Sequence, residues 1–202
     1  MRRASSAHSL PHPSFPRSQR FVAAPELLAA SADERFPHAM FESVTGGAPV
    51  AADDIFAGAR ATIVTLAFQG LGQSQLRPWH AAITKSLAPP AASAAGPSRS
   101  VQLANVLFLE GWFWKLARGI IAQTTANALP PGPLRDATFL TVCPSSRDTD
   151  HWCDAARVHN RMMAHVMIVD SAGRVRWRAH GALAHGEQDS LASAALSLAQ
   201  VR

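Results

Sequence analysis

The stretch AHVMIVDSAGRVRWRAHG, residues 164–181, decides the fold, because an apolar run, a turn and an alternating run follow one another directly. Residues 165–169 are apolar enough for a strand that is buried on both faces. Residues 170–173 supply the polar side chains and the glycine that a short hairpin turn needs. Val175 and Trp177 then alternate with arginines, which predicts one packed face and one face toward solvent or a partner. The stretch is therefore a predicted β-hairpin.

The rest of the chain alternates strands with helices. Three apolar runs rich in branched side chains predict buried strands, at residues 61–68, 101–109 and 137–143. Helices are predicted at residues 74–87, with Pro78 near the start, and at 111–129, 148–163 and 187–201. A short helix is expected at 21–32, the beginning of the folded part at 36–41, and turn and loop at 49–58. This order predicts an α/β fold, a thioredoxin-like mixed sheet flanked by helices that ends in a β-hairpin and a C-terminal helix.

Composition limits the class of protein. With 202 residues and 48% apolar content, the chain has room for one domain with a sizeable core. It contains no apolar run of about 18 residues, so an integral membrane protein is not predicted. Basic residues outnumber acidic ones, 19 to 14, but no segment concentrates them, and nucleic-acid binding is not indicated. Two cysteines are too few for a disulfide scaffold, which favours a reducing compartment.

The N-terminal segment differs from the rest of the chain. It contains Arg2, Arg3, Arg17 and Arg20 together with several serines, and it has no acidic residue before Glu26. This composition is typical of an organellar transit peptide, and the alternative is a disordered tail, because three prolines interrupt any helix. We therefore divide the chain into a transit peptide and N-terminal extension, residues 1–32, and a domain, residues 33–202, with a Pro/Ala/Ser-rich insert at 88–100.

Redox chemistry at the usual thioredoxin site is excluded by composition. Active members carry C-x-x-C at the start of the helix after the first core strand, where the helix dipole lowers the thiol pKa. Here that loop reads GLGQSQLRPW, with Gln73, Ser74 and Gln75 in the place of the thiols. The proline that precedes the hairpin strand in such enzymes is also missing. We predict no catalytic residue and no enzyme activity.

Cys143 and Cys153, with His151, His159 and His165, form the only group that resembles a soft-metal site. Zinc knuckles pair their ligands as C-x2-C, whereas residues 144–152 separate these two cysteines. A metal site, a reversible or structural disulfide and inert packing remain as interpretations. The sequence favours packing, since a buried free cysteine behaves as a small apolar residue. No metal and no cofactor are predicted.

Four segments carry a resemblance to a known family. They are FPHAMFESVTGG (36–47), ATIVTLAFQGLGQSQLRPW (61–79), LFLEGWFWKLARGIIAQTTANALP (107–130) and HVMIVDSAGRVRWRAHGALAHGE (165–187). In this order, and without the cysteines, they resemble the mitochondrial assembly factors that chaperone subunit a (subunit 6) of the F0 sector of ATP synthase. The resemblance implies a redox-inactive thioredoxin-like fold, a location in the mitochondrial matrix peripheral to the inner membrane, and newly made subunit a as the client.

Two surfaces are candidates for partner binding. Trp112 and Trp114 lie two positions apart on a predicted helix, whose apolar stripe is Trp112, Leu116 and Ile120, and so cannot both point into one core. One of them is left to meet a hydrophobic client or the membrane interface, unless it only covers the edge of the core.

The second surface is the arginine face of the hairpin. Arg174, Arg176 and Arg178 are placed to contact acidic groups or lipid phosphates, or to form a solvated strand face.

Two other functions compete with the assembly chaperone. One is a structural or assembly component of another mitochondrial complex, such as the mitoribosome, with RNA or a ribosomal particle as partner; the excess of arginine favours it and the absence of a basic run weakens it. The other is a thiol enzyme that uses Cys143 or Cys153 at an unusual place.

Overall fold

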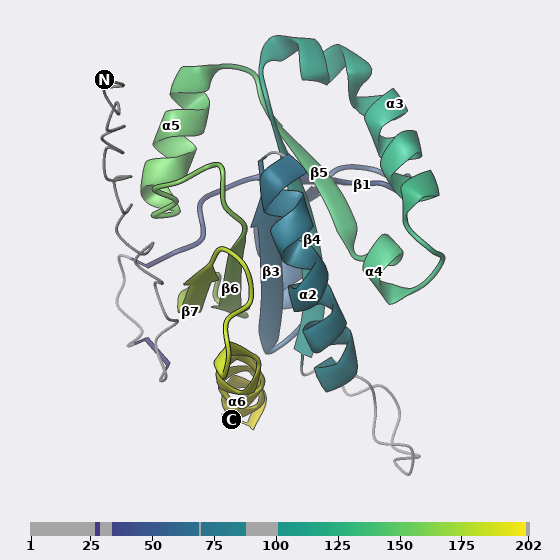
Figure 1. Ribbon diagram of the computed structural model, residues 1–202. Helices are drawn as coiled ribbons and strands as arrows, with labels where there is room; N and C mark the ends of the chain where they lie inside the picture. The colour runs from purple at the N-terminus through teal and green to yellow at the C-terminus, as the bar shows by residue number, and fades with distance from the viewer. Residues whose placement is uncertain (1–26, 29–33, 69, 88–100, 201–202) are drawn as a thin grey trace, which may run out of the picture.

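The computed structural model describes residues 27–28, 34–68, 70–87 and 101–200. The strands of these residues form one seven-stranded mixed sheet in the order β2-β1-β5-β4-β3-β6-β7 (Figure 1). The strands are β1 (Met40–Ser43), β2 (Val50–Ala51), β3 (Ala61–Ala67), β4 (Val101–Glu110), β5 (Thr138–Cys143), β6 (His165–Asp170) and β7 (Val175–His180). The helices are α1 (Ala52–Ala57), α2 (Gly70–Leu87), α3 (Trp112–Ala128), α4 (Pro133–Asp136), α5 (Ser146–Ala155) and α6 (Glu187–Gln200).

Strand β3 lies in the interior of the sheet, between β4 and β6, and all of its residues are buried. It pairs in parallel with β4 and antiparallel with β6. β4 pairs in parallel with β5, and β6 continues through the turn into antiparallel β7. The Asp170 carboxylate holds this turn by accepting hydrogen bonds from the backbone N–H groups of Ala172 and Arg174. The predicted mixed sheet, its buried strands and the terminal hairpin and helix are thus confirmed.

Each face of the sheet has its own apolar core. On one face α2 and α6 cover β3 and β6, and the rings of Trp79 and Trp177 meet edge to face at 6.2 Å. Trp79 also donates a hydrogen bond through Nε1 to the carbonyl of Gly181, at 3.0 Å. The opposite face carries α1 and α5, and its core is rich in aromatic rings. These rings are Phe36, Phe41, Phe56, Phe108 and Trp152.

Several predicted boundaries were wrong. Residues 49–58 form β2 and α1 rather than turn and loop, because the short strand pairs with β1 and Phe56 is buried in the aromatic core. Helix α2 begins at Gly70 and not at residue 74, so Pro78 lies in its interior. Helix α5 ends at Ala155, well before residue 163, because Arg157 adopts a positive φ of 53° that a helix cannot continue through.

A bulge also changes the predicted face of β7. Val169 pairs with Val175 and Ile168 pairs with Trp177, so Arg176 is the extra residue between them. Val175 therefore packs in the aromatic core, while Trp177 packs on the opposite face, under α6. The prediction that both side chains share one face was wrong, because a bulge reverses the alternation on which it rested.

The outer edge of β7 is lined by residues from the N-terminal part of the chain. The N–H of Leu28 donates to the carbonyl of Arg176 at 2.7 Å, and the N–H of Val175 donates to the carbonyl of Glu34 at 2.6 Å. Leu27 is half-buried against the core beneath α6. Folded contacts thus reach into the segment 1–32 that the sequence assigned to the extension. The rest of the predicted helix 21–32 and the insert 88–100 lie outside the described residues.

We predict that these edge contacts stabilise the domain. A chain that starts at Asp33 loses the two hydrogen bonds between Leu28 and Arg176 and the burial of Leu27, and it should be about 1–3 kcal/mol less stable than a chain that starts at Glu26. Urea unfolding of the two chains measures the difference. Equal unfolding midpoints would show that the contacts contribute nothing.

Candidate functional site

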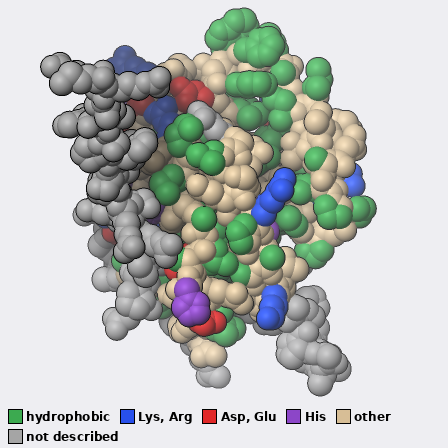
Figure 2. All heavy atoms as spheres, viewed as in Figure 1, with side chains coloured by type: hydrophobic (Ala, Val, Ile, Leu, Met, Phe, Trp, Pro, Cys, Tyr) green, Lys and Arg blue, Asp and Glu red, His purple; other side chains and the backbone are tan. Residues whose placement is uncertain are grey.

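The most unusual surface of the protein is a group of exposed apolar side chains on α3. We call Trp112, Phe113, Trp114, Leu116 and Ile120 the α3 apolar surface. Their exposed fractions are 68%, 58%, 40%, 75% and 74%. Figure 2 shows hydrophobic side chains gathered at the top of the view, over the beginning of α3. Contiguous apolar patches of this kind mark binding surfaces in soluble domains.

The α3 apolar surface is exposed because α3 packs on the sheet through its other side. Ala126 is buried, and Ile121 and Ala122 are half-buried against Leu140 of β5. The predicted stripe of Trp112, Leu116 and Ile120 points away from this contact. We expected one of Trp112 and Trp114 to remain free of the core, and the structure leaves both of them exposed.

The charges on α3 are basic. The helix contains Lys115 and Arg118 and no acidic residue. Arg118 reaches back to Glu42 of β1, with 2.7 Å between its guanidinium nitrogen and the carboxylate oxygen. No helix in the described part of the chain has both the length and the hydropathy needed to cross a bilayer.

A groove of about 440 Å³ separates α3 from α2. Its α3 wall includes Ile121, Thr124 and Ala128, and its α2 wall includes Arg77 and His80. Asn105 of β4 forms part of its floor. The groove therefore mixes apolar and polar side chains in its lining.

A chain of buried hydrogen bonds runs under this groove and crosses three strands. Thr65 Oγ1 donates to Asn105 Oδ1 at 2.9 Å, and Asn105 Nδ2 donates to Thr138 Oγ1 at 3.0 Å. Because the Thr65 proton is used, His80 Nε2 must be the donor in its 3.1 Å contact with Thr65 Oγ1. Sequence reasoning missed this network, although Thr65 and Asn105 inside apolar strands were a signal for it.

Buried His165 and half-buried His80 are both neutral at physiological pH. Burial lowers the pKa of His80 to about 4, although a hydrogen bond with Asn105 acts in the opposite direction. Burial likewise lowers the pKa of His165 to about 4, against the effect of its hydrogen bond with the Asn160 carbonyl. Both side chains therefore serve as uncharged structural groups at neutral pH.

The start of α2, where the sequence predicts no thiol chemistry, contains no cysteine. The helix opens with Gly70-Leu71-Gly72-Gln73, so Gln73, Ser74 and Gln75 lie later in the helix than the sequence suggested. A Cβ on Gly72 would approach the Met163 carbonyl oxygen to 3.2 Å, and Gln75 Oε1 accepts a hydrogen bond from the Ala164 N–H at 2.9 Å. The loop before β6 thus packs against the helix start, and neither segment contains a cysteine.

The two cysteines lie away from this place, on β5 and α5. Both are free thiols, and Cys153 is buried. Burial raises the pKa of Cys143, and it also raises the pKa of Cys153 against the opposing effect of Arg161. The described residues contain no group of three or more side chains arranged to hold a metal ion.

The arginine face of the hairpin is largely used inside the chain. Arg176 contacts the Leu28 carbonyl through Nε at 3.2 Å and the Asp170 carboxylate at 3.3 Å. Arg178 donates to the carbonyl of Ala156 at 2.5 Å, and burial lowers its pKa. Among the described residues, the side chain of Arg174 has no hydrogen bond or ion pair, so it is the freest of the three.

We predict that the buried histidines make stability depend on pH. The unfolded chain takes up protons below about pH 6.5, whereas native His80 and His165 remain neutral to about pH 4, so stability is lost as pH falls through this window. At pH 5 the loss is at most about 2 kcal/mol for each histidine. Urea unfolding at pH 7 and pH 5 should show a smaller loss for His80→Gln than for the original chain, while exposed His151→Gln changes nothing. An identical loss in all three chains would contradict the assignment.

We further predict that neither cysteine is an activated nucleophile. Because a raised pKa leaves little thiolate at pH 7.4, both thiols should react with iodoacetamide at least about tenfold more slowly than glutathione. The urea-unfolded chain provides the control and should react at the glutathione rate. Rapid labelling of either cysteine in the native protein would revive the thiol-enzyme hypothesis.

Comparisons with known proteins agree with this geometry. The family model described as ATP10 protein matches residues 15–198. No curated protein matches the chain. The structure is similar to BsSco, a member of the Sco family of cytochrome c oxidase assembly proteins, with a TM-score of 0.55 and 11% identity over 85% of this chain and 96% of that one.

Two thiol enzymes share the same fold. The thioredoxin domain of a thiol-disulfide oxidoreductase from Bacteroides vulgatus has a TM-score of 0.52 and 13% identity over 85% of this chain and 100% of that one. A secreted thiol-disulfide isomerase from Corynebacterium glutamicum has a TM-score of 0.51 and 14% identity over 93% of this chain and 97% of that one. At these identities the likeness shows a thioredoxin-like fold alone. The family match spans most of the chain, and the protein therefore belongs to the ATP10 family of ATP synthase assembly factors.

Proposed function

We propose that this protein is a non-enzymatic assembly chaperone that holds subunit a of the ATP synthase F0 sector before its incorporation. The observation that carries the proposal is the α3 apolar surface, on which Trp112, Leu116 and Ile120 are each more than two-thirds exposed. A newly made membrane subunit presents apolar helices that need cover from water, and such a surface provides it. Family membership supports the link to ATP synthase.

The absence of thiol chemistry supports a holding role. The scaffold keeps the contact between the start of α2 and the loop before β6, but no cysteine lies there to attack a disulfide. Cys143 and Cys153 have raised pKa values because they are buried, which opposes nucleophilic use. The protein would thus use its shape rather than a reactive group.

We further propose that the protein works at the matrix face of the mitochondrial inner membrane, with residues 1–32 as transit peptide and N-terminal extension. The arginine-rich, acid-free N-terminal segment supports import. Exposed tryptophans beside Lys115 suit the boundary between a membrane and water, where subunit a must be handed over. Arg174 is the hairpin arginine best placed to add a contact with acidic groups.

We predict that polar substitutions on α3 weaken client binding without unfolding the protein. Leu116→Gln with Ile120→Gln should lower recovery of newly made subunit a by about tenfold or more in affinity isolation from mitochondria. Because both side chains are exposed, stability should change by less than about 0.5 kcal/mol each. Leu196→Gln on α6, which is 57% exposed, is the matched control and should leave recovery unchanged.

Two results would overturn the proposal. One is unchanged recovery of subunit a with the α3 variant. The other is recovery of ribosomal RNA and ribosomal proteins in place of ATP synthase subunits, which would favour a role in the mitoribosome.

A further inference from the structure

Strand β4 extends beyond its neighbour β5 and leaves part of the sheet with a free edge. The pairing of β4 with β5 begins at Asn105 and Thr138, whereas β4 itself begins at Val101. The preceding residues of β4 pair only with β3, on the other side. The Asn105 N–H donates to the Ala137 carbonyl at 2.7 Å, on the β5 side. The backbone groups of every second residue along a strand point to the same side, so the N–H and C=O of Leu103 point to the β5 side, as those of Asn105 do. Within the described residues, no strand pairs with Leu103 on that side.

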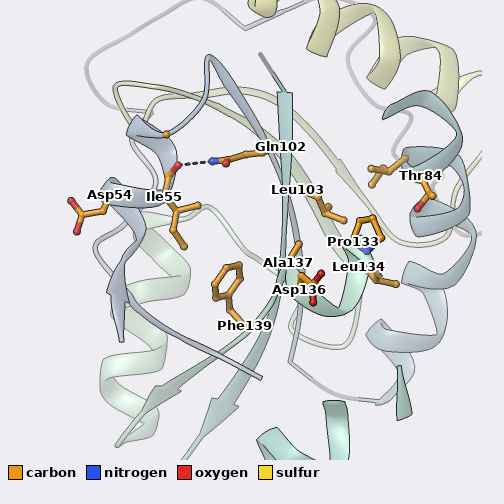
Figure 3. Close-up of a pocket in the computed structure, with 12 residues that line it drawn as sticks. Asp54, Ile55, Thr84, Gln102, Leu103, Pro133, Leu134, Asp136, Ala137 and Phe139 are labelled. Atoms are coloured by element: carbon orange, nitrogen blue, oxygen red, sulfur yellow. Dashed lines mark hydrogen bonds between the residues drawn. The ribbon is translucent and has the colours of Figure 1, made fainter. Parts of the chain in front are cut away.

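Helix α4 precedes β5, so the chain does not run along β4 before Thr138. The N–H of Asp136 donates to Gly132 and that of Ala137 to Pro133, which turns the chain away from the sheet just before β5. A cavity of about 800 Å³ opens beside the free edge (Figure 3). Its apolar lining comes from α1, α2, β4, α4, β5 and the residue that follows α4. The apolar side chains are Ile55, Ile83, Leu103, Pro133, Leu134, Ala137 and Phe139.

The far wall of this cavity is held in place by Gln102. Its Nε2 donates to the carbonyl of Ile55 at 2.5 Å, drawn as the dashed line in Figure 3, and to Thr62 Oγ1 at 3.0 Å. These bonds tie α1 to β4 and β3. The Gln102 amide nitrogen is therefore occupied, and the Leu103 backbone N–H and C=O remain at the edge, where no described strand pairs with them.

The charge of the cavity is opposite to that of the whole protein. Among the described residues, the only charged ones in its lining are Asp54 and Asp136, in a chain of net charge +5. Asp136 lies beside Ala137, while the carboxylate of Asp54 lies at the rim and points outward (Figure 3). Within the described part of the chain neither carboxylate makes a side-chain hydrogen bond or an ion pair. A ligand with positive charge would complement them.

We infer that this cavity binds an extended segment of a partner polypeptide whose side chains alternate between apolar and basic. The segment would add to the sheet by pairing its backbone with Leu103, in the way that peptides extend other exposed sheet edges. Its apolar side chains would enter the cavity, and its Lys or Arg side chains would reach Asp54 and Asp136. The inference is independent of the α3 apolar surface, from which it differs in residues and in charge.

Binding of synthetic peptides to the full-length protein tests the inference. Fluorescein-labelled Val-Lys-Val-Arg-Val should bind in the micromolar range by fluorescence anisotropy, and Val-Glu-Val-Glu-Val at least tenfold more weakly. The basic peptide N-methylated at alternate residues keeps its side chains but cannot pair, so its affinity should also fall at least tenfold. Amide hydrogen exchange at Leu103 should be fast in the free protein and at least tenfold slower with the basic peptide.

Variants of the protein test whether the two aspartates of the cavity contribute to peptide binding. Asp54→Asn with Asp136→Asn should weaken binding of the basic peptide about five- to tenfold, whereas Asp189→Asn on α6 should not. Three results would overturn the inference. They are no binding of the basic peptide, equal binding of its N-methylated form, and slow exchange of the Leu103 amide in the free protein, which would mean that the chain itself covers this edge.

Discussion

Central strand β3 is the constraint on which the other features depend. Its seven residues are all buried, since β4 and β6 flank it and helices cover both faces. Burial on both faces requires that the hydroxyls of its two threonines be satisfied: Thr62 accepts a hydrogen bond from Gln102, and Thr65 bonds to Asn105 and His80. The same network connects β3, β4, β5 and α2. The position of α2 is therefore set by the polar interior of the sheet as well as by apolar packing.

This arrangement explains how a thiol-enzyme scaffold persists without thiols. Gly72 allows the start of α2 to approach Met163, and the Gln75 side chain satisfies the Ala164 N–H. Neither contact involves a cysteine, because a small residue and an amide are enough to make them. The packing at this place therefore does not depend on a thiol pair, which is compatible with the proposed holding role.

The two proposed binding surfaces lie where an element lacks a covering neighbour among the described residues. Helix α3 packs through Ile121, Ala122 and Ala126, so the apolar residues of its first turns have nothing among the described residues to cover them. Strand β4 extends past β5 in the same way, because α4 turns the chain before Thr138. The α3 apolar surface is flanked by basic residues, whereas the cavity beside β4 is flanked by aspartates. The two suit different parts of a client or different partners.

The sequence alone determined the elements and the missing chemistry, because both are local. Buried strands show as apolar runs, the hairpin shows in residues 164–181, and the absence of a thiol pair is a matter of composition. It did not reveal β1, β2 and α1, whose short segments carry little periodicity. Nor did it show that the stripe of Trp112, Leu116 and Ile120 is exposed, since a helical stripe indicates only that apolar residues share a side.

Contacts between distant residues decided the rest. A bulge at Arg176 places Val175 and Trp177 on opposite faces, and Leu28, 148 positions away in sequence, engages the arginine that seemed free to bind a partner. The exposure of α3 depends on which of its sides packs on the sheet, and the free edge of β4 depends on where its neighbour β5 begins. Only the tertiary structure could decide them, because no local pattern records the length of a strand's neighbour or the side from which a helix is covered.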